Sequence, residues 1–208
     1  NVLFINPLNE TMQDITVTQS YPDINRNGNG ASASHLDVSN VTDDIEYTFL
    51  MFAVNTSIFP ILNTNLQEAY VGMTRFSSTA GDIIYVHEMN GTFDEKEMTW
   101  NNQPCGTTES STDLPCNQTV LDYNGVDNEH FGNLTFDIKE AVRIAHEQPS
   151  YDKHLILMIR HTLETTIDQG TGFFSKETTN PEDKCGLYMI VQDTTPPTIN
   201  YLINNTSP

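Results

Sequence analysis

The stretch Glu46–Val54 (EYTFLMFAV) decides the fold class of this chain. Almost every residue in it is aromatic, β-branched or long and apolar, and no polar face recurs at helical spacing. A short continuous run of this kind is typical of a strand that is covered on both faces. His154–Arg160 (HLILMIR) has the same character farther along the chain. The two runs predict buried strands at the centre of the protein.

Shorter strand-like segments surround these two runs, with turn residues between them. They are residues 14–20, 35–38, 66–76, 82–88, 172–175 and 187–191. A helix competes for Leu66–Phe76, but Val71, Gly72 and Thr74 disfavour it. Many short strands separated by turns at intervals of about 8 to 15 residues predict an all-β fold, a jelly-roll β-sandwich.

One segment breaks the β pattern. In Phe136–Glu147 (FDIKEAVRIAHE), Asp137 can cap a helix. Apolar residues then recur at helical spacing: Ile138, Ala141, Val142 and Ala145. We expect one short helix here.

The chain divides into three parts. Residues 1–13 form an N-terminal extension with an apolar strand, Val2–Ile5, and residues 14–192 form the main domain. Residues 193–208 contain adjacent prolines and are expected to be a linker followed by the start of another module. Val2–Ile5 and Thr198–Ile203 lie outside the main domain. We expect them to pair within the chain or with a neighbouring copy, because exposed apolar edge strands recruit partners.

The charge balance excludes several classes of partner. The formal net charge is -19, from 9 basic and 28 acidic residues. Nucleic-acid binding requires clustered Lys and Arg, and so does docking to an anionic membrane surface. No apolar run approaches the length of a membrane span, so we expect no direct membrane insertion within this chain.

Several features indicate an oxidising, extracellular location. Asn-X-Ser/Thr sequons, which together favour a glycosylated exterior, begin at Asn9, Asn40, Asn55, Asn90, Asn117, Asn133, Asn204 and Asn205. Cys105 and Cys116 flank a polar loop and are predicted to form a disulfide. Cys185 is left over and is expected to be a buried free thiol.

One motif resembles a known family. Asp94–Pro104 (DEKEMTWNNQP), preceded by the aromatic Phe93, resembles the W-x-E-x-x-x-T-W-N-N-x-P stretch of the DNRLRE domain family. That family overlaps the family 96 carbohydrate-binding modules and the disaggregatase-related repeats of archaeal surface proteins. Further stretches resemble the family in the same order: residues 22–38, 47–52, 135–142 and 173–177.

The resemblance covers about residues 12–192 and implies a non-catalytic jelly-roll module displayed outside the cell. Some relatives bind acidic polysaccharide. The chain departs from the pattern: the arginine of the family's R-x-Y-L-x-F-D strand is absent, with Glu46 preceding Tyr47, and Ala53 stands where the family has aspartate. The scarcity of basic residues also argues against an anionic glycan.

A calcium site is one interpretation of the turn that contains Asp23, Asn25, Asn27 and Gly28. Oxygen ligands on alternate residues of a turn can converge on one ion. The twelfth position of an EF-hand would be Ser34, so this is not that motif. The other interpretation is an Asn- and Gly-rich turn without an ion.

Four residues are candidates for ligand binding: Arg75, Trp100, Arg160 and Lys176. Trp100 could stack on a sugar ring or pack beneath its loop. Arg75, Arg160 and Lys176 could lie on a polar binding face or form ordinary ion pairs.

The sequence contains no strong catalytic motif. His87-Glu88 lacks the second histidine of a metal motif. Asp94, Glu95 and Glu97 offer carboxylates for glycoside hydrolysis, but their turn explains them equally well. We therefore expect a non-catalytic extracellular module that binds polysaccharide or the cell envelope. The alternative is a structural subunit of a surface layer, sheath or filament, assembled by β-strand addition.

Overall fold

The fold is built from antiparallel strands and one short helix. The computed structural model describes residues 2–4, 12–26, 34–41, 43–54, 66–79, 81–89, 91–104, 119–127, 131–147, 154–162, 170–180 and 182–192. The first strands are β1 (Val2–Phe4), β2 (Met12–Thr18), β3 (His35–Val41), β4 (Asp44–Ala53), β5 (Leu66–Ser78) and β6 (Ile83–Met89). A 3₁₀ turn, η3 (Trp100–Asn102), β7 (Val120–Gly125), β8 (Gly132–Asp137), α2 (Lys139–Glu147), β9 (His154–His161), β10 (Gly170–Phe174) and β11 (Gly186–Gln192) follow.

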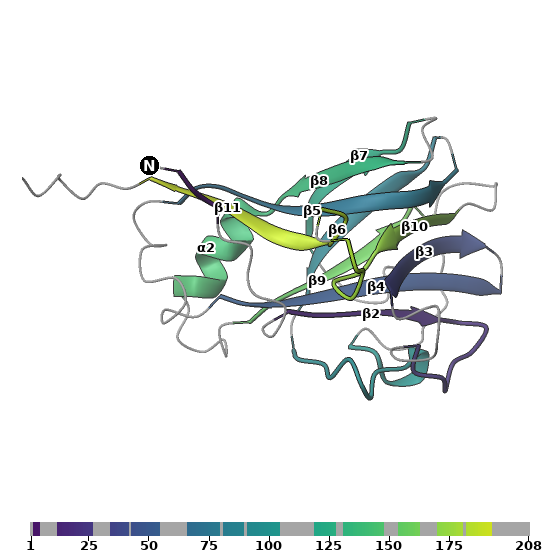
Figure 1. The fold of residues 1–208 in the computed structure, drawn as a ribbon. Coiled ribbons are helices and arrows are strands. Elements are labelled where there is room, and N and C mark those ends of the chain that lie inside the picture. The colour runs from purple at the N-terminus through teal and green to yellow at the C-terminus, as the bar shows by residue number, and fades with distance from the viewer. Residues whose placement is uncertain are drawn as a thin grey trace, which may run out of the picture.

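One layer of the sandwich is centred on β4. Strand β2 pairs along one side of β4, and β9 pairs along the other, with Thr48 opposite Ile159. Strand β6 continues the layer beyond β9, and β7, which pairs with β6, lies beside β8 of the other layer. Figure 1 shows β2 and β4 on the lower side of the molecule, opposite β5, β7 and β8.

The other layer is centred on β5. Strand β8 pairs with one side of β5, while β11 and then β10 pair with the other side. Strand β1 extends this layer by pairing with β11, so that Val2 lies opposite Gln192. Strand β10 also pairs with β3, which pairs with β4, so one continuous sheet curls into both layers (Figure 1).

The main core lies between the layers. Phe52, Phe136 and Phe173 each have an exposed fraction of 0%. Alternate residues of β9, such as Leu157, point into this core, and the residues between them, such as Met158, point to the opposite face. That opposite face is buried too, which explains why the sequences of β4 and β9 have no polar side.

A second core covers the outer face of β2, β4 and β9. Residues 91–104 fold over this face and bury Met98 and Trp100 against it. The Trp100 ring stacks on Tyr47, with centroids 5.3 Å apart and planes inclined by 24°. The segment with the strongest family resemblance is therefore a lid over the sheet.

Helix α2 closes one end of the sandwich (Figure 1). A carboxylate oxygen of Asp137 accepts a hydrogen bond from the backbone N–H of Lys139 at 3.0 Å, as expected for a residue that caps the first turn. Ala141, Val142 and Ala145 are buried against the main core. The predicted helix is confirmed, although it starts later than expected because Phe136 and Asp137 still belong to β8.

The all-β sandwich with one short helix is confirmed for the described residues. The predicted strands 14–20, 35–38, 46–54, 66–76, 82–88, 154–160, 172–175 and 187–191 correspond to β2, β3, β4, β5, β6, β9, β10 and β11. The predicted strand Val2–Ile5 is seen as β1, and it pairs within its own chain. Strands β7 and β8 were not predicted from the sequence. In the described part of the chain, the only α-helix is too short and too polar to cross a bilayer.

Candidate functional site

The open face of the β5 layer carries a pair of stacked tyrosines. Tyr70 of β5 lies directly opposite Tyr188 of β11. Their ring centroids are 5.3 Å apart and their planes differ by only 11°. Gly72 makes room for this arrangement, because a Cβ atom at that position would lie 2.8 Å from the ring of Tyr188. Both tyrosines are half-buried, so parts of their rings remain accessible.

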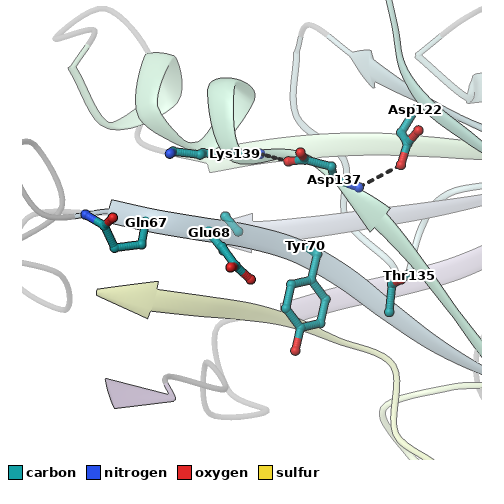
Figure 2. Close-up of a pocket in the computed structure, with 8 residues that line it drawn as sticks. Gln67, Glu68, Tyr70, Asp122, Thr135, Asp137 and Lys139 are labelled. Carbon is teal, nitrogen blue, oxygen red and sulfur yellow. Dashed lines mark hydrogen bonds between the residues drawn. The ribbon is translucent and has the colours of Figure 1, made fainter. Parts of the chain in front are cut away.

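Beside Tyr70 the surface is hollowed. The hollow has a volume of about 390 Å³, and its lining comes from β5, β7, β8 and the start of α2 (Figure 2). Its lining residues are Gln67, Glu68, Ala69, Tyr70, Asp122, Thr135, Asp137 and Lys139. Binding sites for small molecules commonly occupy about 300–1,000 Å³, and the hollow falls at the lower end of this range.

Hydrogen bonds between side chains and the backbone hold the polar wall of the hollow in place. The Asp122 carboxylate accepts a hydrogen bond from the N–H of Asp137 at 2.8 Å, and Asp137 in turn binds the N–H of Lys139 (Figure 2). Asn124 of β7 donates from its side chain to the carbonyl of Thr135 at 3.3 Å. These bonds join β7 to β8, so the wall is formed by ordered strands.

The chemistry of the hollow suits a ligand rich in hydroxyl groups. Glu68, Asp122 and Asp137 are acceptors, Lys139 is a donor, and Tyr70 offers an aromatic face. Three carboxylates face one ammonium group, so an anionic ligand would meet net repulsion.

The four residues predicted to bind a ligand do not form one site. Arg75 has an exposed fraction of 2% and points into the end of the sandwich, where it pairs with Asp127 at 2.9 Å. Trp100, exposed by 5%, belongs to the second core. Their part in ligand binding stays a prediction.

Arg160 lies on the outer face of the β4 layer. It donates to His87 Nε2 at 3.0 Å and to the carbonyl of His161 at 2.7 Å. Its guanidinium carbon lies 5.0 Å from the ring centre of Tyr85, which also contacts the exposed Tyr123. Tyr85, Tyr123 and Arg160 thus form a second aromatic face, and none of the three lines the hollow.

Lys176 is buried beneath the lid. Its ammonium donates to the carbonyl of Met12 at 2.9 Å and to the carboxylate of Glu95. Asp14 and Glu177 also lie close to this ammonium, at 3.6 Å and 3.4 Å. Its role in ligand binding is untested and stays a prediction.

Two residues of the predicted calcium turn fasten the lid. Asp23 accepts a hydrogen bond from the Asn101 side chain at 2.7 Å. Asn25 donates to the carbonyls of Glu95 and Met98, both at 2.8 Å. Asn27 lies outside the described residues, and calcium stays a prediction.

The remaining predictions fall mostly outside the described residues. This applies to Cys105, Cys116 and six sequon asparagines, namely Asn9, Asn55, Asn90, Asn117, Asn204 and Asn205. Asn133 is exposed, whereas the side-chain nitrogen of Asn40 donates to the carbonyl of Thr162 at 3.1 Å. Cys185 is a buried free thiol, as predicted, and burial raises its pKa well above the usual value.

The hollow was not predicted from the sequence. It depends on β7 and β8, which were not predicted, and on the register that brings Tyr70 opposite Tyr188. The alternation of Glu68, Tyr70 and Gly72 along one side of β5 was the available signal, since residues two apart share a face.

A β-sandwich with an aromatic and acidic hollow on an open sheet face is typical of the ligand-binding β-sandwich modules. Within that class, the chain belongs to carbohydrate-binding module family 96, whose family model matches residues 9–187. This confirms the family 96 part of the resemblance, and the DNRLRE and archaeal disaggregatase parts stay predictions. No curated protein matches the chain.

Proposed function

We propose that this protein is a non-catalytic extracellular module that binds a neutral polysaccharide through the hollow on the β5 layer. The observation that carries the proposal is the accessible ring of Tyr70 beside the fixed carboxylates of Asp122 and Asp137. Family membership supports a carbohydrate as the ligand class.

The two kinds of wall would act on different parts of a sugar. The apolar face of a pyranose ring packs on an aromatic side chain, and the hydroxyl groups at its edge donate to carboxylates. Tyr188 stacks on Tyr70 and fixes the plane of its ring, so less rotamer freedom is lost on binding. The acidic wall favours neutral over uronic-acid sugars.

The geometry favours binding over hydrolysis. A glycosidase needs a carboxylic acid kept protonated, usually in an apolar pocket, opposite a second carboxylate. Glu68 and Asp137 are instead exposed side chains at an open surface. Carbohydrate-binding modules are also non-catalytic in general, which supports the same assignment.

A glycan array followed by calorimetry tests the proposal. We expect binding to a neutral polysaccharide, weakened about tenfold, or ~1.4 kcal/mol, by Tyr70→Ala. Tyr123→Ala is the matched control, because it removes an exposed aromatic side chain that does not line the hollow. Loss of binding through Tyr123→Ala instead, or binding restricted to uronic-acid polymers, would contradict the proposed site.

A structural role is the second candidate, and β1 favours it. This strand lies outside the matched residues 9–187, yet it pairs with the edge of β11. The same pairing with a neighbouring copy would link modules by β-strand addition. Deletion of residues 1–8 would then convert an assembly into monomers, as seen by electron microscopy. An assembly that survives the deletion rules out this role for β1.

A further inference from the structure

A lysine surrounded by three carboxylates lies under the lid, between β2 and the segment after β10. Lys176 is exposed by only 8%. Its ammonium donates to Glu95 and to the carbonyl of Met12, and lies 3.4 Å from a carboxylate oxygen of Glu177. Neither the fold nor the proposed glycan site requires a charged cluster at this place.

The carboxylate of Asp14 has two differently placed oxygens. Oδ2 accepts hydrogen bonds from the backbone N–H of Lys176 at 2.8 Å and from the thiol of Cys185 at 3.3 Å. Oδ1 is buried and has no hydrogen-bond partner among the described residues, although the Lys176 ammonium is only 3.6 Å away. A buried carboxylate oxygen without a partner is costly, so this arrangement calls for an explanation.

A metal ion does not explain the cluster. One oxygen from each of Asp14, Glu95 and Glu177 lies within 4.8 Å of the others, which is compatible with a shared cation. However, the Lys176 ammonium already contacts all three carboxylates and supplies that positive charge. A metal ion would have to displace it.

We propose that Lys176 and Asp14 condense into an intramolecular isopeptide bond, with Glu95 carrying the proton. The amine nitrogen and the carboxyl group are buried together, as required for a reaction that must exclude competing water. Glu95 is the neighbouring carboxylate that binds the same amine.

The reaction balances without another reagent. The ammonium first gives a proton to Glu95, and the neutral amine attacks Cγ of Asp14. Negative charge that develops on Oδ2 is stabilised by its two donors, the Lys176 N–H and the Cys185 thiol. Glu95 passes its proton to Oδ1, then carries a second proton from the attacking nitrogen to the same oxygen, and the Cγ–Oδ1 bond breaks to release Oδ1 as water. In sum, one ammonium and one carboxylate become one amide and one water.

The protonation states support these roles. Burial, assisted by the charge of Glu177, raises the pKa of Asp14 to about 7. Asp14 is thus partly protonated near neutral pH, and a neutral carboxyl group loses oxygen more easily than a carboxylate. Burial alone would lower the pKa of Lys176, but the hydrogen bond to Glu95 and the charges of Asp14 and Glu177 raise it. The amine therefore needs a proton acceptor, and Glu95 is in place.

The test is the mass of the protein, produced without glycosylation. Intact folded protein should be lighter than its sequence by one water molecule. Digestion should release a branched peptide in which Asp14 is joined to Lys176. Lys176→Arg and Asp14→Ala should restore the full mass, and Glu95→Gln should slow the loss of water. Lys184→Arg, which changes a lysine outside the cluster, should leave the linkage intact.

Three results would overturn the proposal. The first is a full-length mass that does not change after prolonged incubation of the folded protein. The second is a loss of water without a branched peptide, which would indicate a cyclised aspartate. The third is a linkage of Lys176 to Glu95 or Glu177. All three come from the natural sequence, so they hold even where a variant fails to fold.

Discussion

Replacing Trp100 with alanine should strongly destabilise the protein. The side chain is exposed by only 5%, stacks on Tyr47 and belongs to the second core with Met98. Removing a buried aromatic side chain of this size typically costs about 3–5 kcal/mol. The stacked pair itself accounts for roughly 0.5–1.5 kcal/mol of this loss.

Urea unfolding followed by far-UV circular dichroism measures the effect. Tryptophan fluorescence cannot serve as the probe, because Trp100→Ala removes the only tryptophan in the chain. Tyr123→Ala is the matched control, since its side chain is 63% exposed and its loss should change stability by no more than about 0.5 kcal/mol. Single and double substitutions of Tyr47 and Trp100 by leucine would isolate the stacking energy.

The reasoning fails if Trp100→Ala lowers the free energy of unfolding by less than about 1 kcal/mol, well below the range for buried aromatic residues. A loss of glycan binding by Trp100→Phe, with stability unchanged, would also contradict it. That result would make the ring a ligand contact rather than the centre of the second core.

Three further predictions concern separate parts of the molecule. Gly72→Ala places a Cβ atom 2.8 Å from the Tyr188 ring, so calorimetry should show about tenfold weaker glycan binding, and unchanged affinity would argue against the tyrosine pair. Burial raises the pKa of Glu46 to about 7, so the folded state keeps a proton that the unfolded chain releases above its usual pKa of 4.5. The free energy of unfolding should therefore fall as pH rises from 4.5 to about 7. In the Glu46→Gln variant this fall should be smaller by on the order of 2 kcal/mol, and parallel profiles of unfolding free energy against pH for the two proteins would refute the raised pKa. Glycopeptide mapping should find sugar on the exposed Asn133 but not on Asn40, whose side-chain nitrogen already donates a hydrogen bond to the carbonyl of Thr162, and the reverse pattern would contradict this.

Hydrophobic pattern was enough to predict most of the fold. Glu46–Val54 and His154–Arg160 are apolar throughout because both faces of their strands are covered. Strand β7, with the sequence VLDYNG, was missed because its exposed edge position allows Asp, Asn and Gly, which resemble turn residues. Strand β8 was missed because Phe136 and Asp137 lead directly into α2 and were assigned to the helix.

The site was harder to predict because it depends on pairing between distant segments. Nothing near Tyr70 in the sequence indicates that Tyr188 lies opposite it. The sequence also shows where charges are but not what they contact. Arg75 and Lys176 stood out as rare cations in an acidic chain, yet each is buried with carboxylate partners. Rare charged residues of this kind form buried ion pairs as often as they contact a ligand.

The pairing of β1 with β11 determines how the module would respond to mechanical load. Val2 lies opposite Gln192, so the outermost residues of the paired strands sit side by side. A force pulling these two residues apart acts along the inter-strand hydrogen bonds and loads them one after another. Strand β1 would therefore separate from β11 one hydrogen bond at a time, at low force. The tyrosine pair, which joins β5 to β11, and the hollow on β5 would keep their shape until β11 itself was drawn out.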